Sequence, residues 1–139
     1  MMVRKEEKIK KKKKIITDAL KTCLERDVYS KITVQDIADE SGFSKGGVLH
    51  YFQTKEDIYL DLIADIFSEL VQAHASLMEW NIKIEDVGPI SALVGAEKFI
   101  LGSNNMRILI NLLLYSFEDD KIMAIMRKNM RKQLNFYNN

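Results

Sequence analysis

Cysteine, proline and glycine are scarce in this sequence of 139 residues. Its single cysteine, Cys23, excludes an intramolecular disulfide and a cysteine-based zinc site, which suits a reducing cytoplasm. No apolar run reaches the roughly 20 residues of a membrane-spanning helix. Lysines stand where the apolar stretch of a secretory signal would lie. The sequence therefore predicts a cytoplasmic protein that neither crosses a membrane nor depends on disulfides.

Motifs of catalysis and of cofactor binding are missing as well. There is no Gly-x-Ser-x-Gly, no His-Glu-x-x-His and no phosphate-binding loop. The two histidines, His50 and His74, are too far apart in sequence to suggest a metal site, and Asp119 and Asp120 suit a helix start better than a catalytic pair. We expect no enzyme activity, no metal and no cofactor, and a small helical enzyme is the weakest alternative.

Apolar residues recur at helical spacing almost throughout the chain, which predicts an all-α protein. Capping signatures, glycines and the proline divide the pattern into expected helices over residues 7–26, 34–40, 45–52, 55–78, 89–101, 106–117 and 119–137. The segment 106–117 is apolar on nearly every face, so we expect that helix to be fully buried.

The formal net charge of +1 hides a strongly basic N-terminus. Residues 1–14 hold eight lysines and arginines against two glutamates. A basic arm on a nearly neutral body indicates a polyanionic partner met at one end. The alternative is a solvated, frayed terminus, and charge alone does not decide between the two.

Two short capped helices joined by a three-residue turn predict a helix-turn-helix at residues 33–52. Thr33 with Asp36 has the pattern of a capping box, and Ser44 is a second candidate N-cap. This geometry needs a small residue where the helices cross, which is Ala38, and a glycine in the turn, which is Gly42. It also needs apolar residues that hold the two helices together, and these are Ile37, Phe43 and Val48. The alternative is an ordinary corner between two helices that binds nothing.

Four stretches of this region together resemble the DNA-binding domain of the tetracycline-repressor (TetR) family. They are Thr-Val-Gln-Asp-Ile-Ala at 33–38, Gly-Phe-Ser-Lys-Gly-Gly at 42–47, His-Tyr-Phe at 50–52 and Thr-Lys-Glu at 54–56. The resemblance implies a three-helix DNA-binding head at 9–69, preceded by the basic arm 1–14. A long fourth helix would join the head to a helical ligand-binding and dimerisation domain at 70–139. Because the family usually has further helices, we expect this second domain to be truncated at its C-terminus.

The resemblance also implies a function and partners. It implies a transcriptional repressor that is released from a palindromic operator in double-stranded DNA by a small-molecule effector, unknown here and largely apolar. A homodimer is implied too, weakened in this short chain. The alternative is a helical protein-interaction module that kept the helix-turn-helix and lost operator binding.

Roles for individual residues follow from the resemblance, position by position. Ser44 would cap the recognition helix and touch the DNA backbone, and Lys45 would reach a guanine edge or a phosphate. Gly46 and Gly47 would allow close approach to the bases, Leu49 stands at a base-reading position, and His50 would contact bases or phosphates. Thr33, Tyr51 and Lys55 would hold phosphates, which set register rather than sequence. The family usually has threonine where Gly47 stands and tyrosine where Leu49 stands, so thymine methyl contacts or DNA shape would supply part of the specificity.

Aromatic and methionine side chains of the second half could line the effector pocket. The candidates are His74, Met78, Trp80, Phe99, Met106 and Tyr115. Such residues at helical spacing are also typical of plain core packing, and that alternative stays open for each of them.

Overall fold

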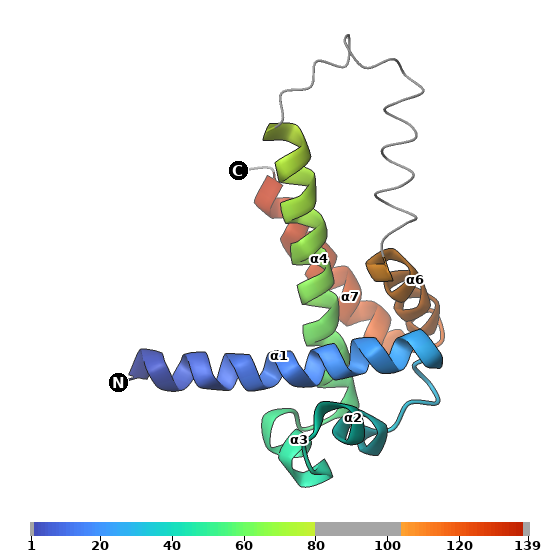
Figure 1. The fold of residues 1–139 in the computed structure, drawn as a ribbon. Coiled ribbons are helices and arrows are strands. Elements are labelled where there is room, and N and C mark those ends of the chain that lie inside the picture. Colours follow the sequence, from blue (N-terminus) through green and yellow to red (C-terminus); the bar gives the residue numbers. More distant parts are fainter. Residues whose placement is uncertain (1, 80–103, 138–139) are drawn as a thin grey trace.

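The computed structural model describes residues 2–79 and 104–137, and these residues form α-helices joined by short connections, with no strand among them (Figure 1). The helices are α1 (Met2–Arg26), α2 (Val34–Ser41), α3 (Lys45–Tyr51), α4 (Lys55–Glu79), α6 (Asn104–Ser116) and α7 (Asp120–Tyr137). The all-α prediction is confirmed, with boundaries close to those expected. The helix predicted at 89–101 lies outside the described residues.

The helix starts are fixed by the side chains that the sequence marked as caps. The Thr33 hydroxyl accepts a hydrogen bond from the Asp36 amide, and the Asp36 carboxylate accepts one from the Thr33 amide, which completes a capping box for α2. Thr54 and Asp57 repeat the reciprocal pattern at the start of α4, with distances of 3.1 and 3.2 Å. Because these caps satisfy amides that a helix start leaves free, they set where each helix begins.

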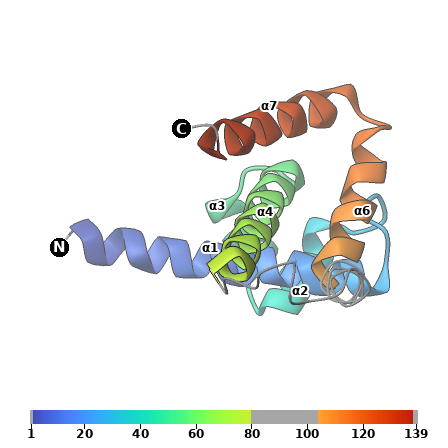
Figure 2. The same ribbon diagram turned by 90° about the horizontal axis from the view of Figure 1, so that it is seen from above.

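The helices α1, α2 and α3 form a head, and α4 leads away from it (Figure 1). Viewed from above, α4 lies between α1 and α7, while α6 closes one side (Figure 2). The buried core runs continuously from Leu20 and Ile37 in the head, through Leu62 of α4, to Leu112 of α6 and Met126 of α7. The Tyr59 hydroxyl donates to the Leu112 carbonyl at 2.9 Å and lies 3.3 Å from the Met126 sulfur. The head therefore shares one core with the helices that follow it.

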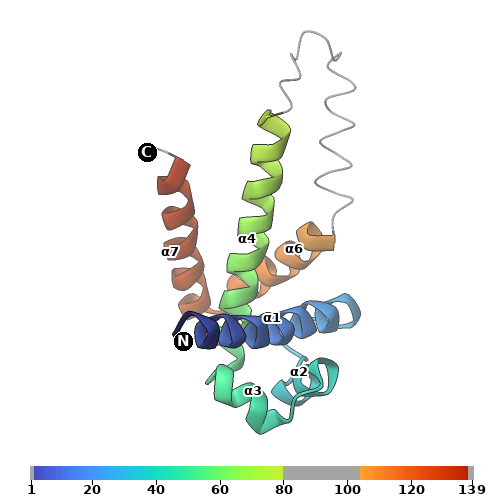
Figure 3. The ribbon, with the colours of Figure 1, turned by 60° about the vertical axis from the view of Figure 1, so that its left-hand side comes forward.

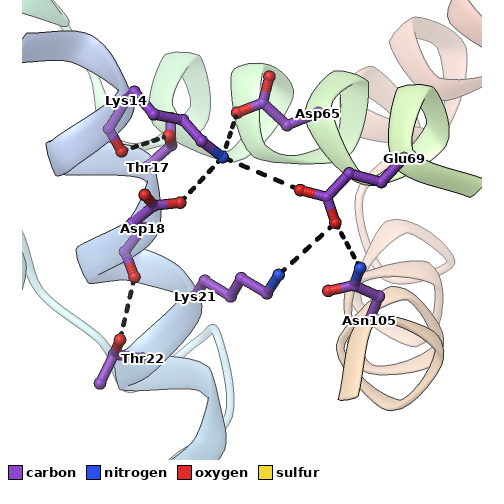
Figure 4. A network of polar contacts seen from close by, with 8 residues as sticks. All are labelled: Lys14, Thr17, Asp18, Lys21, Thr22, Asp65, Glu69 and Asn105. Carbon is purple, nitrogen blue, oxygen red and sulfur yellow. Dashed lines mark hydrogen bonds and ion pairs between the residues drawn. The ribbon is translucent and has the colours of Figure 1, made fainter. Parts of the chain in front are cut away.

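A polar network on the surface ties α1 to α4 and α6 (Figure 4). The Lys14 ammonium lies 3.0 Å from the Asp18 carboxylate and 3.3 Å from that of Asp65. Glu69 receives Lys21 at 3.9 Å and accepts a hydrogen bond from Asn105. Partial burial opposes protonation of Lys14, but the hydrogen bond to Asp18 and the charge of Asp65 outweigh it and raise its pKa. Exposed pairs of this kind each contribute little energy, so the network adds to the contact that the shared core already makes between α1 and α4.

The basic N-terminus differs from the expected arm. The helix α1 begins at Met2 instead of residue 7, so residues 2–14 are the first half of one straight helix (Figure 3). Buried positions of α1 start only at Ile16, and the basic half is exposed. Lysine, arginine and glutamate are good helix formers, and the second half of α1 is anchored in the core. The helix therefore continues outward through the lysine run.

The prediction that the apolar helix over 106–117 is fully buried is wrong for the described residues. In α6, Ile108, Leu109 and Leu112 face the core, whereas Ile110 is 47% exposed and Leu114 63% exposed. Among the described residues, one face of α6 packs against α1, α4 and α7, and the opposite apolar face is exposed. Nowhere in residues 2–79 and 104–137 does a helix have both the length and the apolar character needed to cross a membrane.

Candidate nucleic-acid interface

The two short helices of the head lock together as the sequence predicts. Ile37 and Ala38 of α2 and Val48 of α3 are completely buried between the helices and α1. Gly42, which ends α2, has φ +74°, a conformation that costs a residue with a side chain about 1–2 kcal/mol. The turn can therefore reverse the chain within three residues and place α3 across the end of α2.

The third helix directs its polar and small residues outward. Its N-cap is Ser44, whose hydroxyl accepts the Gly47 amide at 3.0 Å. Lys45, Gly46, Leu49 and His50 are exposed, while Val48 points into the core. Lys45 and Leu49 lie four residues apart and so share one face of the helix. The major groove of DNA is wide enough to admit an α-helix. The exposed seven-residue α3, held to the core by the buried Val48, is therefore suited to enter it.

The two glycines of α3 differ in what surrounds them. A Cβ at Gly46 would meet nothing within 4 Å, so the fold itself does not require a glycine there. A Cβ at Gly47 would lie 3.1 Å from the Ser44 hydroxyl and 3.4 Å from the Phe43 ring. The packing of the N-cap thus favours glycine at 47, a reason that the sequence did not show. Close approach of Gly46 to the bases stays a prediction.

Tyr51 and His50 form a small aromatic cluster with Phe43 at the ends of α3. Tyr51 is half-buried, with its ring edge-on to Phe43 at 5.9 Å and to His50 at 5.0 Å between centroids. The packing holds both α3 residues in fixed positions at the edge of the exposed face. Their roles toward phosphates or bases remain predictions.

Thr33 is placed differently from a free phosphate ligand. Its amide and its hydroxyl both donate to the Asp36 carboxylate, each at 2.7 Å. Those two bonds lower the pKa of Asp36 and keep the carboxylate ionised beside the helix start. A phosphate could gain the donors of Thr33 only by displacing this negative charge, so the structure gives Thr33 the role of a cap.

Lys55 also turns inward. Its ammonium donates to the carbonyl of Tyr29 at 3.2 Å and to that of Ile32 at 2.9 Å, and lies 4.3 Å from the centre of the Tyr29 ring. Burial lowers the pKa of this lysine. The ammonium therefore stabilises the connector between α1 and α2 against the start of α4. A phosphate contact by Lys55 would have to compete with these three interactions.

The predicted effector-pocket residues fall into different settings. His74 and Met78 belong to the last turns of α4, Met106 is half-buried on α6, and Trp80 and Phe99 lie outside the described residues. Tyr115 packs edge-on against Tyr29 at 4.6 Å and lines a cavity of about 380 Å³ between α6 and the connector that follows α1. Met106 and Tyr115 lie nine residues apart on α6, which places them on opposite sides of it.

Sequence reasoning missed how the lysine run meets the head. The Lys12 ammonium lies 5.2 Å from the centre of the Phe43 ring, and that of Lys13 lies 4.7 Å from the Phe52 ring. These two phenylalanines flank α3 on either side. If the first helix had been predicted to continue through the lysine run, its helical geometry would have placed Lys12 and Lys13 beside the head. The positive surface of the protein therefore extends from α3 onto the first half of α1.

Comparison with known proteins agrees with this geometry. The family model described as bacterial regulatory proteins, tetR family, matches residues 16–62. An uncharacterized HTH-type transcriptional regulator, YfiR, of Bacillus subtilis (strain 168) is 39% identical over 61 residues, which are 44% of this chain and 29% of the relative. No solved structure gives a significant match. The chain thus matches less than a third of the length of this curated relative, and the matched family is one of regulators rather than enzymes.

Proposed function

We propose that this protein is a transcriptional regulator that binds double-stranded DNA through α3, because residues 16–62 match the family model described as bacterial regulatory proteins, tetR family. The observation that carries the proposal is the capped, exposed α3 fixed to the core by Val48. Its first turn carries Lys45 and no acidic residue, which favours an anionic partner.

The proposed contacts follow the geometry. Lys45, in the first turn of α3, reaches a guanine edge or a phosphate, and Gly46 lets the backbone approach the bases. Leu49, on the same face as Lys45, offers an apolar contact to a thymine methyl group. Ser44, at the N-cap of α3, and Tyr51, at its end, contact phosphates of the DNA backbone. Gly47 lets the protein backbone approach the bases, and His50 contacts a base or a phosphate. Thr33 caps α2, and Lys55 binds carbonyls of the connector between α1 and α2, so both contribute indirectly.

We further propose that the protein is a repressor that works as a homodimer on a palindromic operator. The helix-turn-helix reads a short half-site, and paired heads about 34–36 Å apart would meet successive major grooves. A small molecule that favours another spacing of the heads would release the DNA by shifting the population of conformations. The continuous core from the head to α6 and α7 supports such coupling, because a change in the later helices must repack against Tyr59 of α4.

Selection of bound duplexes from a random pool tests the proposal most directly. We expect enrichment of one motif, with two inverted copies if the protein binds as a dimer. Lys45→Ala should weaken binding to that motif, whereas Lys121→Ala on α7 is the control and should not. Recovery of random sequences only, with equal affinity for all duplexes, would instead favour a protein-interaction module that has lost operator binding.

A further inference from the structure

The first half of α1 is a basic helix that reaches beyond the packed head. Residues 2–14 hold eight basic and two acidic side chains, and they extend about 20 Å at the 1.5 Å rise of an α-helix. No acidic residue lies in the first turn of α1, so the positive end of the helix dipole coincides with Arg4 and Lys5. Figures 1 and 3 show this half passing over the head on the side of α3.

The two sides of this basic helix have different surroundings. Lys10, Lys11, Lys13 and Lys14 line a groove of about 630 Å³ toward α4, where Asp61 and Asp65 also lie. Lys5 and Lys8 fall within about 40° of Lys12 around the helix, because successive residues turn by 100°. Lys12 is the lysine that lies against Phe43, next to the start of α3. Among the described residues, no ion pair includes Lys5, Lys8 or Lys12.

We propose that Lys5, Lys8 and Lys12 form a second contact surface, along which the rigid N-terminal half of α1 follows the phosphate backbone of DNA beside the site read by α3. This inference rests on the proposed function and names a further part of the interface. A helix with its side chains is about 10–12 Å wide, whereas the minor groove is only about 6 Å wide. The segment is therefore too wide for the minor groove, and in this proposal it contacts phosphates and reads no bases.

Unbound, this arrangement is electrostatically unfavourable. Lys8 and Lys12 are like charges four residues apart, as are Lys10 and Lys14, and such pairs destabilise a helix. Of these four lysines, Lys14 has carboxylate partners on α1 and α4 within the described residues. A row of phosphates would neutralise Lys8 and Lys12, since duplex DNA carries one negative charge per roughly 1.7 Å of its axis.

The test compares two triple variants that each remove three exposed positive charges. The first variant carries Lys5→Gln, Lys8→Gln and Lys12→Gln, in which glutamine keeps a good helix former at each position. The matched control carries Lys121→Gln, Lys128→Gln and Arg131→Gln on α7, which lies on the opposite side of α1 from α3. Binding constants are measured against salt concentration on the duplex selected by the wild-type protein and on a scrambled duplex.

We expect the α1 variant to lose about 2–3 from the slope of log K against log salt, because each phosphate contact contributes roughly 0.9. Its preference for the selected over the scrambled duplex should equal that of the wild type, and the control should keep the wild-type slope. A slope equal to that of the control overturns the proposal. A changed preference overturns it as well, because it would mean that the segment reads bases.

The experiment separates this proposal from the proposed function. If the wild-type protein does not distinguish the two duplexes, the sequence-specific function fails, while the slopes on the scrambled duplex still test α1. If no form of the protein binds DNA in a salt-dependent way, both proposals fall. Equal thermal unfolding of the variants and the wild type would show that the changes act at the surface and leave the fold intact.

Discussion

Replacing Lys55 by methionine separates a structural role of this lysine from a role in DNA binding. Methionine keeps much of the aliphatic stem and removes the ammonium, which donates to two carbonyls of the α1–α2 connector and lies over the Tyr29 ring. Hydrogen bonds from charged groups contribute about 1.5–3 kcal/mol each, and a cation–π contact at a partly exposed site about 0.5–1 kcal/mol. The variant, however, no longer buries a charge, and water can reach the freed carbonyls. We therefore expect a net loss near 2 kcal/mol.

Urea and thermal unfolding of Lys55→Met measure this loss. A destabilisation of about 2 kcal/mol should lower the midpoint of thermal unfolding by roughly 5–10 °C in a chain of this size. The matched control is Lys45→Met, the same substitution ten positions earlier at an exposed site, which should leave the midpoint nearly unchanged. DNA binding is then measured well below both midpoints, so that every variant is folded.

The two variants should behave in opposite ways in the DNA-binding experiment. Lys45→Met should lose affinity, while Lys55→Met should keep the wild-type slope of log K against log salt. The reasoning is refuted if Lys55→Met unfolds like the wild type and its slope falls by about 0.9, since that is the signature of one lost phosphate contact.

Three further outcomes are expected. Lys45→Ala should change the preference among duplexes by about 1–3 kcal/mol if Lys45 reads a base, and a uniform loss on all sequences would reduce it to a phosphate contact. Gly42→Ala should lower the free energy of unfolding by about 1–2 kcal/mol, because residue 42 has a positive φ. Gly46→Ala has open space around its Cβ, so it should stabilise α3 by up to about 1 kcal/mol and weaken DNA binding. Equal stabilities of the two variants in urea would contradict this account. Asp36→Ala should be less stable than the wild type above pH 3.8, the ordinary pKa of the carboxyl group. Because the folded-state pKa is lowered, that difference should fade as the pH falls through the folded value. A difference independent of pH in acid unfolding would show that the Asp36 charge is not the cause.

The helices and their limits were largely readable from local sequence. Thr33 with Asp36 and Ser44 cap helices where the pattern placed them, because capping depends on residues only three positions apart. The need for a positive φ at Gly42 is equally local. Hence the head, the turn and the exposure of α3 could be predicted without tertiary information.

The roles of individual polar side chains depended on partners distant in sequence. Lys55 lies 23 and 26 residues from the carbonyls that it binds, so nothing in its neighbourhood indicated that it turns inward. The apolar pattern of α6 suggested burial on all sides, but the number of neighbouring elements decides how many faces are covered.

The basic N-terminus shows the same division between local and tertiary information. Composition by itself determined that residues 1–14 carry a concentrated positive charge and attract polyanions, because charge is independent of conformation. Whether that charge lies on a flexible arm or on a rigid helix was decided by the anchoring of α1 in the core from Ile16 onward. A helix propagates readily from an anchored turn but nucleates poorly by itself, so only the packed structure fixed the direction of the lysine run and brought Lys12 beside α3.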